Sequence, residues 1–360
     1  MRELFCLHTG TSISISFEIY VGGGVREGTN VEFKHKTVAG VDAFHEKWDC
    51  DGMPQDTRFP ETMQTAIGLY NLDLVDRWKR RCRDYPDALI DQEMANCLAP
   101  GGLYHLRRVW EAGDLIGHRH LSARLIVGLI DSLCAINRHY SPSYKWNAWT
   151  LGRLELKPAN AWQRVQEVFS HPADAASSLT SLLDDCTRLS SAYSGQWLDV
   201  RVRLESETQD PGLETGALTA TGEASIGEAI RRFEWSWSNR VSFYCFREDM
   251  FHHAMFVRRA RSLLRLIGAI NGVEEETSSF RWVSIMPKFD RAPEHFEDRF
   301  RAAFSPDFPE GQRTLDGLIE DALLLARDCY DPEFVNDHLS QFRDKRRPAW
   351  DGPPDVDFLK

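Results

Sequence analysis

A short segment near the middle of the chain carries side chains that could bind a charged ligand. Arg138 and Lys145 lie close together in the sequence, with Tyr140 and Tyr144 between them. Guanidinium and ammonium groups bind carboxylates and phosphates, and a tyrosine adds an aromatic face and a hydroxyl. These four residues therefore predict a pocket for an anionic or phosphate-bearing ligand.

A divergent version of this segment occurs further along the chain. One apolar run ends in Ala135-Ile136-Asn137, and another ends in Ala269-Ile270-Asn271 about 135 positions later. The second loop begins with Glu274-Glu275-Glu276 and keeps an Arg281-Trp282 pair in place of Lys145-Trp146. Structural anchoring of the loop is enough to explain the repeated tryptophan, without a role in ligand binding. If one copy binds an anion, we expect it to be the first, with the second as a buttress.

A set of histidines and aspartates also recurs with this spacing. Asp114, His118 and His120 align with Asp249, His252 and His253. Metal binding needs ligands on one side, whereas histidines two positions apart on a helix do not face each other. We expect polar helix ends that face solvent, with a pocket shared by both copies as the alternative.

Two aromatic or glycine-rich motifs have structural explanations. Gly22-Gly23-Gly24 could cradle a phosphate, but no Gly-Lys-Ser/Thr follows it, and a hairpin loop is favoured. Phe233-Glu234-Trp235-Ser236-Trp237 could be a platform for a sugar or a base, but buried packing is favoured.

The composition is that of a globular protein with two or three domains. The 360 residues are 42% apolar and 27% charged, and the net charge of −11 disfavours broad attraction to a polyphosphate. The sequence has no apolar run long enough to span a membrane and no secretory signal. Eight cysteines without a Cys-x-x-Cys pair favour a reducing compartment. We therefore predict a cytoplasmic protein with no membrane partner.

Hydrophobic periodicity predicts an α+β chain that is predominantly helical. Alternation indicates strands over 13–19 and 30–35, which form a hairpin, and a possible strand over 197–204. Three- and four-residue spacing predicts helices at 37–48, 62–69, 74–82, 86–98, 121–137 and after Pro158. The predicted domains are an α/β region at 1–60, a helical bundle at 61–195, a linker at 196–222, a second helical copy at 223–330 and a charged tail at 331–360.

The first loop also carries a family resemblance. Residues 136–146 and the following Leu154-Glu155-Leu156-Lys157-Pro158 resemble the helical domain that accompanies nucleotidyltransferase modules. In those proteins an Asn-Arg-x-Tyr-x-Pro-x-x-Lys-Trp signature ends one long helix. The family is DUF4037, related in architecture to the aminoglycoside nucleotidyltransferases. The resemblance covers about residues 30–190 and, through the repeat, extends weakly over 220–328. It implies that the hairpin is a remnant of a nucleotidyltransferase domain.

The N-terminal region departs from the family at the catalytic carboxylates. The family supplies a Gly-Ser turn, an Asp-x-Asp pair and a third carboxylate to hold Mg²⁺. Glu32 matches the third carboxylate and is the candidate catalytic residue. Gly10-Thr11-Ser12 followed by Glu18 is the nearest match to the rest, but Tyr20 stands where a second carboxylate is needed. We expect the catalytic half to be truncated or degenerate, with Mg²⁺ as a cofactor only if nucleotidyl transfer survives.

Three function classes remain open from the sequence. The first is an enzyme on a remodelled nucleotidyltransferase scaffold, with a small-molecule or nucleotide pocket formed by the first helical copy and the hairpin. The second is a non-catalytic binding or interaction protein. The third is an enzyme that uses tRNA or aminoacyl-tRNA, such as an arginine-containing cyclodipeptide synthase. Separately, Arg247 and His252 have a spacing that resembles the motif of HEPN ribonucleases, but the first copy lacks it.

Overall fold

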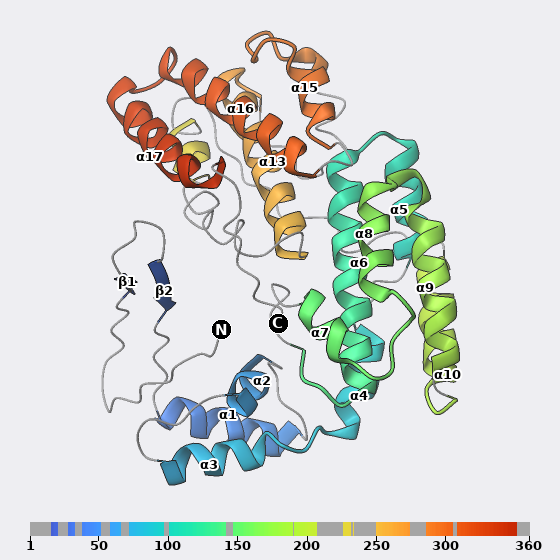
Figure 1. Ribbon diagram of the computed structural model, residues 1–360. Helices are drawn as coiled ribbons and strands as arrows, with labels where there is room; N and C mark the ends of the chain where they lie inside the picture. Colours follow the sequence, from blue (N-terminus) through green and yellow to red (C-terminus); the bar gives the residue numbers. More distant parts are fainter. Residues whose placement is uncertain are drawn as a thin grey trace. The chain divides into compact units, whose positions relative to one another are not determined.

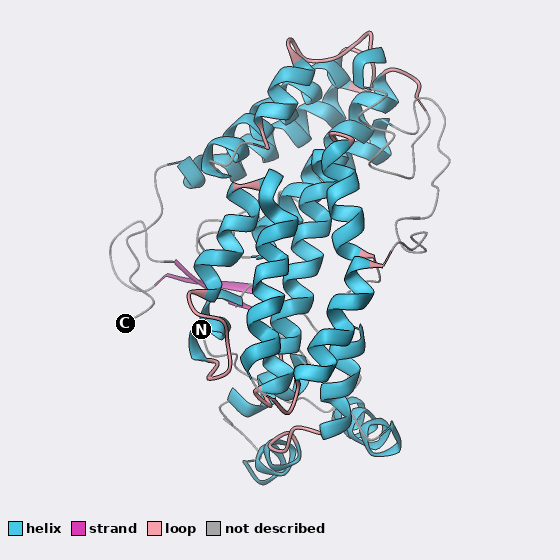
Figure 2. Ribbon diagram, turned by 90° about the vertical axis from the view of Figure 1, so that its right-hand side faces the viewer, coloured by secondary structure: helices cyan, strands magenta, loops and turns pink. Residues whose placement is uncertain are grey.

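The computed structural model is predominantly helical (Figure 2). It describes residues 16–20, 28–32, 38–51, 58–65, 72–96, 101–141, 147–189, 191–206, 226–231, 233, 250–273, 286–304 and 308–350. Among these residues, no helix has the length and apolar character needed to cross a membrane. The buried thiols of Cys82, Cys134 and Cys186 are free.

The chain divides into two compact units. The first unit consists of residues 1–96, 130–143 and 153–156, and the second of residues 97–129, 144–152 and 157–360. The long helix α6 (Leu115–Ile136) contributes its first part to the second unit and its last part to the first unit.

Two short strands pair near the N-terminus. Strand β1 (Ser16–Tyr20) lies antiparallel to β2 (Gly28–Glu32), and the register sets Glu32 opposite Ser16. They form a two-stranded sheet, and the described residues contain no other strand. That this pair is the remnant of a nucleotidyltransferase domain stays a prediction. The glycines at 22–24 lie outside the described residues.

Four helices of the first unit precede α6 (Figure 1). They are α1 (Val38–Asp51), α2 (Arg58–Thr65), α3 (Leu72–Arg81) and α4 (Asp87–Asn96). Trp78 of α3 is buried, and its indole N–H donates to Asp42 of α1 over 3.3 Å. Gln64 of α2 donates to the carbonyl oxygen of Cys82 over 2.7 Å. Apolar faces and these bonds together link α1, α2 and the end of α3.

The second unit holds most of the remaining helices. They are α5 (Gly102–Glu111), α7 (Asn147–Arg153), α8 (Ala161–Ser170), α9 (Ala175–Leu189), α10 (Ser194–Glu205), α13 (Met250–Ile270), α15 (Phe296–Ala302), α16 (Phe308–Arg327) and α17 (Pro332–Trp350). The 3₁₀ turns η2 (Pro172–Asp174) and η3 (Met286–Lys288) precede α9 and α15.

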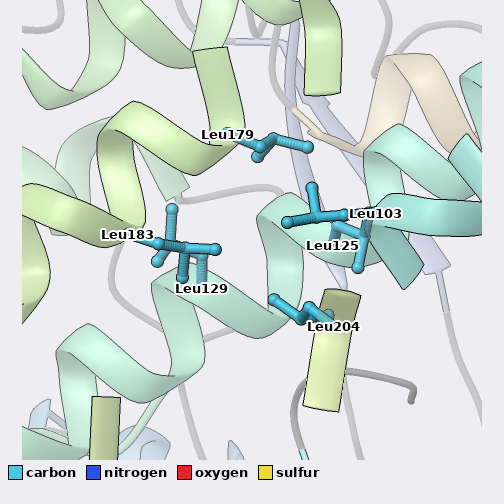
Figure 3. Close-up of a pocket in the computed structure, with 6 residues that line it drawn as sticks. All are labelled: Leu103, Leu125, Leu129, Leu179, Leu183 and Leu204. Carbon is cyan, nitrogen blue, oxygen red and sulfur yellow. The ribbon is translucent and has the colours of Figure 1, made fainter. Parts of the chain in front are cut away.

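Helices α5, α6, α9 and α10 pack through leucines. Six of these side chains surround a small apolar cavity (Figure 3): Leu103, Leu125, Leu129, Leu179, Leu183 and Leu204. At Gly102 an added Cβ would come within 2.6 Å of a Leu125 methyl group, so the close approach of α5 requires glycine. The cavity has no polar lining residue, and we interpret it as a packing space of the core.

A second apolar core joins α13, α15, α16 and α17. Its fully buried members include Phe256, Phe300, Leu318 and Phe342, and Ile116 from the start of α6 also belongs to it. Such a core excludes water and supplies most of the stability of the bundle.

Two predictions about local structure were wrong. The predicted strand at 197–204 is part of helix α10, because Trp197, Val200 and Leu204 are buried at helical spacing. The alternation that suggested a strand includes Val202, which is exposed. The segment predicted as a charged tail from residue 331 is helical to Trp350, because α17 buries three apolar residues, Val335, Leu339 and Phe342, in the second core.

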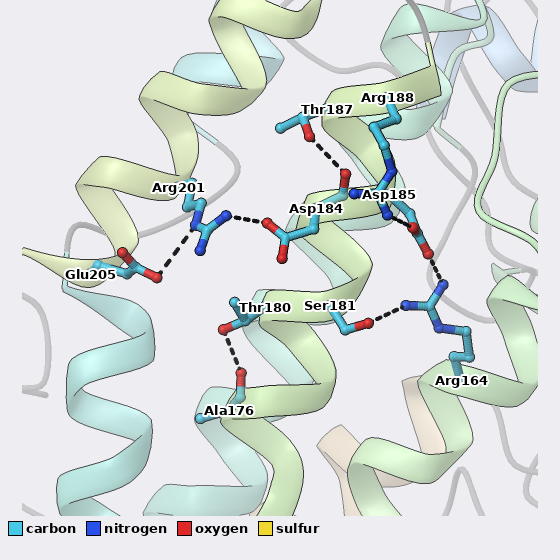
Figure 4. A network of polar contacts seen from close by, with 10 residues as sticks. All are labelled: Arg164, Ala176, Thr180, Ser181, Asp184, Asp185, Thr187, Arg188, Arg201 and Glu205. Carbon is cyan, nitrogen blue, oxygen red and sulfur yellow. Dashed lines mark hydrogen bonds and ion pairs between the residues drawn. The ribbon is translucent and has the colours of Figure 1, made fainter.

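Two polar contacts recur between α8–α10 and α15–α17. The guanidinium of Arg164 on α8 pairs with Asp185 on α9 (Figure 4), and Arg299 on α15 pairs with Asp321 on α16 over 2.8 Å. Asp184 on α9 pairs with Arg201 on α10, and Glu320 on α16 pairs with Arg343 on α17 over 2.8 Å. Similar ion pairs therefore connect the helices of both sets.

Candidate anion-binding loop at the end of helix α6

The loop that carries the predicted ligand-binding residues begins where α6 ends, and Asn137 fixes its start. The side-chain amide of Asn137 donates to the carbonyl oxygens of Leu133, over 2.7 Å, and Leu156, over 2.9 Å. Its side-chain oxygen accepts the backbone N–H groups of Glu155 and Leu156 over 3.1 and 2.8 Å. One side chain thus joins the helix end to the chain that leads toward α8.

Arg138 follows in the left-handed region of backbone conformation, with φ of 56°. This turn lets the N–H of His139 reach back to the carbonyl oxygen of Cys134 over 2.9 Å, which is the usual closure of a helix C-terminus. Glycine normally occupies such a position, because a Cβ atom disfavours the left-handed region. An arginine here is therefore an unusual choice.

The Arg138 guanidinium points back toward the start of α4. One of its nitrogens lies 2.6 Å from a carboxylate oxygen of Asp87, and another donates over 3.5 Å to the carbonyl oxygen of Tyr85. Both charged side chains are exposed, by 54% for Arg138 and 81% for Asp87. The ion pair therefore orients a guanidinium that remains accessible to a ligand.

Tyr140 has a different environment from that expected of a pocket-lining residue. Its side chain is 2% exposed, its hydroxyl donates to the carbonyl oxygen of Asp84 over 3.0 Å, and its ring centroid lies 4.8 Å from that of Tyr85. Burial raises the pKa of the phenol. Tyr140 therefore anchors the base of the loop. Tyr144 and Lys145 lie outside the described residues, so their predicted role stays a prediction.

The end of α13 has the same arrangement without the charge. The amide of Asn271 donates to the carbonyl oxygens of Ile267 and Arg291 over 2.8 Å each, and its oxygen accepts the N–H of Arg291 over 2.9 Å. The position that follows is Gly272, with φ of 66°, and Val273 N–H reaches back to Gly268 over 2.9 Å. The same backbone turn is thus built with arginine after α6 and with glycine after α13.

Ser141 of the same loop contacts one of two neighbouring carboxylates, Asp131 of α6 and Glu93 of α4. Ser141 donates its hydroxyl to Asp131 of α6. Burial, and then the negative charge of Asp131, raise the pKa of Glu93 on α4 to about 7. The sequence analysis missed these residues, although Glu93 and Asp131 each interrupt a helix face that is otherwise apolar. Near neutral pH this pair can hold a proton.

The prediction that the recurrent histidines face solvent was wrong. His118 is 5% exposed and His253 is 2% exposed. His253 stacks on Phe169 with ring centroids 3.6 Å apart, and burial lowers the pKa of His118 to about 4. The Asp114 carboxylate caps α6 by accepting the Gly117 N–H over 2.8 Å. These groups close the helix starts within the second unit.

The remaining candidates fall largely outside the described part of the chain. The backbone of Glu32 belongs to β2, but its side chain is not described, nor is that of His252. Arg247, Trp235, Trp237 and Trp282 also lie outside, whereas Phe233 is fully buried, as packing predicts. Within the described residues, no three histidine, cysteine, aspartate or glutamate side chains are grouped to hold a metal ion.

Comparison with protein families identifies one match. Residues 60–147 match the model of a domain of unknown function, DUF4037, which confirms the resemblance over this range. The matched segment begins in α2 and ends at the start of α7, so it contains the Asn137–Arg138 helix end. No curated protein and no solved structure matches the chain.

Proposed function

We propose that the chain is a nucleotidyltransferase-like binding protein whose loop after α6 recognises the phosphate or carboxylate of a small molecule or nucleotide. Arg138 is the proposed contact residue among the described residues, with Tyr144 and Lys145 as further proposed contacts from the same loop. Tyr140, buried at the base of the loop, holds the loop in position. Standard metal-dependent nucleotidyl transfer is not part of the proposal, because the Gly-Ser and Asp-x-Asp motifs have no counterpart in this sequence.

The observation that carries the proposal is the left-handed conformation of Arg138. A non-glycine residue in this region costs about 1–2 kcal/mol. The exposed ion pair with Asp87 offsets only about 0–1 kcal/mol. Gly272 shows that this chain uses glycine in the same backbone conformation after α13. Strain that stability does not explain is typical of functional positions.

The proposal includes a common origin for the two helical sets. The asparagine at each helix end recurs after 134 positions, and three of the four members of the two ion pairs recur after 135 or 136 positions, which supports duplication of one helical unit. The first copy keeps the basic loop, and the second has Gly272 and three glutamates after it. We therefore assign ligand binding to the first copy and a role in stabilising the fold to the second copy.

Calorimetric titration with ATP and AMP tests the loop as a binding site. We expect a nucleotide to bind the unmodified chain and Arg138→Gly to weaken that binding by about tenfold or more, since a charge-assisted contact is lost. The control is Arg327→Gln, which removes an exposed charge from α16 without touching the loop. Equal binding by Arg138→Gly and the unmodified chain would contradict the proposal.

The same titration with tRNA tests the two alternatives, an enzyme that uses tRNA and a non-catalytic interaction protein. An enzyme that uses tRNA predicts tight, salt-dependent binding of tRNA and weak binding of free nucleotide. An interaction protein predicts that neither probe binds. If the chain turns over ATP and Glu32→Ala abolishes this turnover, the result would instead support nucleotidyl transfer as the function, with Mg²⁺ as its cofactor.

A further inference from the structure

Three basic side chains lie together at the end of α3 in the first unit. Lys79 and Arg80 belong to the last turn of this helix, and Arg83 follows shortly after it. The backbone N–H of Arg83 donates to the carbonyl oxygen of Arg80 over 3.2 Å, so the chain continues to wind here. Residues three or four positions apart on such a path are neighbours, which places Arg83 beside both other residues. We call these three residues the α3 basic group.

The α3 basic group is not engaged in holding the fold together. Two of its members are exposed, and Lys79 is half-buried. Among the described residues, no hydrogen bond or ion pair engages their side chains. The neighbouring arginines differ, because Arg77 pairs with Asp42 of α1 over 3.6 Å and Arg81 donates to the carbonyl oxygen of His45 over 3.2 Å. Packing of α3 on α1 therefore uses two arginines and leaves the group available to a ligand.

Positive charge dominates this end of α3, although the whole chain is acidic. Residues 77–83 contain five basic residues and no acidic residue. Asp76 and Asp84 flank the segment, and within the described part of the chain neither carboxylate forms an ion pair. The next carboxylate, Asp87, is paired with Arg138 over 2.6 Å. Cations near a helix C-terminus also stabilise the helix by about 0.3–1 kcal/mol each, which is the structural explanation that a test must separate.

Hydrogen bonds join the end of α3 to the Arg138 loop. The carbonyl oxygen of Asp84 accepts the Tyr140 hydroxyl over 3.0 Å, and that of Tyr85 accepts from the Arg138 guanidinium over 3.5 Å. Arg83 directly precedes these two residues. Since consecutive Cα atoms are about 3.8 Å apart, the Arg138 guanidinium lies within about 13 Å of the Arg83 Cα atom. The long side chains of Arg83 and Arg138 can therefore contact the same ligand.

We propose that the binding site of the Arg138 loop extends onto the α3 basic group and takes a ligand with a chain of two or more phosphates. Arg138 contacts one phosphate, and Arg83 and Arg80 contact those that follow. The inference rests on the proposed function, because it uses the same loop. A single phosphate or carboxylate needs only the Arg138 guanidinium, whereas further free cations match further negative charges.

The extent of the group favours a compact ligand over a nucleic acid. Its three side chains lie within about one turn of a helix, a few ångströms along the axis. Recognition of RNA uses basic residues spread over a long stripe, and a chain with a net charge of −11 is poorly suited to it. The apolar residues Val75 and Trp78 of α3 are buried, so among the described residues this helix offers the group no apolar face to insert into a lipid surface.

Calorimetric titration with AMP, ATP and inorganic tripolyphosphate, at low salt and without Mg²⁺, tests the extension. The unmodified chain is compared with Arg80→Gln/Arg83→Gln. The matched control is Arg107→Gln/Arg327→Gln, which removes the same charge from exposed positions of the second unit. We expect the unmodified chain and the control to bind ATP at least about tenfold more tightly than AMP, since further charge-assisted contacts form. The α3 variant should bind AMP normally and ATP only about as tightly as AMP.

The outcomes separate this inference from the proposed function. Equal affinity of the unmodified chain for ATP and AMP, or unchanged ATP binding by the α3 variant, would overturn the extension alone, provided that Arg138→Gly still weakens nucleotide binding. Absence of binding by all three probes would overturn both proposals. Binding of tripolyphosphate that Arg138→Gly leaves unchanged would show that the loop and the group do not share a ligand. Tighter binding of tRNA than of tripolyphosphate, lost in the α3 variant, would assign the group to nucleic acid instead.

Thermal unfolding separates ligand binding from stabilisation of the helix. A purely structural role predicts that Arg80→Gln/Arg83→Gln lowers the unfolding temperature and leaves the ratio of ATP to AMP affinity unchanged. The proposal predicts a folded variant whose affinity ratio falls to about one. Tripolyphosphate should raise the unfolding temperature of the unmodified chain and of the control, but not that of the α3 variant. An equal rise in all three chains would overturn the proposal.

Discussion

The guanidinium of Arg138 lies 2.6 Å from the carboxylate of Asp87, although both side chains are largely exposed and Arg138 has a φ of 56°. An exposed ion pair contributes little to the free energy of unfolding, and the left-handed backbone subtracts from it. The pair therefore holds a guanidinium in place at a small net cost. Gly272, at the equivalent helix end, makes no such contact and has no such strain.

Replacement of Arg138 separates strain from charge. Arg138→Ala loses the ion pair and keeps the strain, whereas Arg138→Gly loses both. We expect Arg138→Gly to change the free energy of unfolding by less than about 1 kcal/mol, and Arg138→Ala to be less stable than it by about 1 kcal/mol. Urea unfolding followed by circular dichroism measures both. An Arg138→Gly variant destabilised by several kcal/mol would show that arginine is structurally required.

The two helix-end asparagines should be the most sensitive polar residues of their loops. Asn137→Ala removes four hydrogen bonds and leaves backbone groups of the helix end and of Leu156 without these partners. We expect a loss of about 2–4 kcal/mol, since each net bond contributes about 0.5–1.5 kcal/mol.

Asn271→Ala is the matched test at the end of α13. It removes three hydrogen bonds of the same kind, so we expect a loss of about 2–3 kcal/mol. Urea unfolding of both variants gives the comparison. A large loss at one position and none at the other would mean that the two helix ends are not equivalent.

Parts of this fold follow from local sequence patterns and parts do not. The helical spacing of apolar residues predicts α6 and the helix after Pro158, and the Ala-Ile-Asn motif marks two real helix ends. The pattern at 197–204 was misleading, because Val202 is apolar but exposed, so helix and strand periods both fitted. Only packing against neighbouring helices decides such a case.

The candidate sites show the same limit. Arg138 could be singled out from its basic and aromatic neighbours, but its left-handed conformation could not. The burial of His118 and His253 depends on helices that are distant in sequence. The polar residue type suggested exposure to solvent, whereas both side chains are buried and His253 stacks on Phe169. The placement of Glu93 near Asp131 is likewise a result of helix packing.

Glu93 predicts a dependence of stability on pH. Burial and Asp131 raise its pKa from 4.5 to about 7, so the folded chain keeps a proton that the unfolded chain releases between these values. The contribution of Glu93 to stability is therefore greatest below about pH 4.5, falls as the pH rises to about 7, and is constant above. The full change is on the order of 2–3 kcal/mol.

Glu93→Gln tests this assignment, because glutamine keeps the shape and does not titrate. We expect the variant to be more stable than the unmodified chain at pH 8 and to lack the fall between pH 5 and 7. Urea unfolding at several pH values measures the difference. Parallel pH profiles for the two chains would assign the proton to another group.

The buried ion pair between Arg259 and Asp316 should respond in opposite ways to single and double replacement. Arg259 on α13 is 2% exposed and Asp316 on α16 is fully buried, and Gln312 accepts a further hydrogen bond from Arg259 over 2.9 Å. Asp316→Ala leaves a buried guanidinium without this carboxylate, so we expect a loss of about 3–5 kcal/mol. Arg259→Met/Asp316→Leu removes both charges and fills the space with apolar groups, and its stability should lie within about 1–2 kcal/mol of the unmodified chain or above it. Thermal and urea unfolding compare the variants. If the double variant is as unstable as Asp316→Ala, the pair specifies the packing of α13 on α16 rather than merely balancing charge.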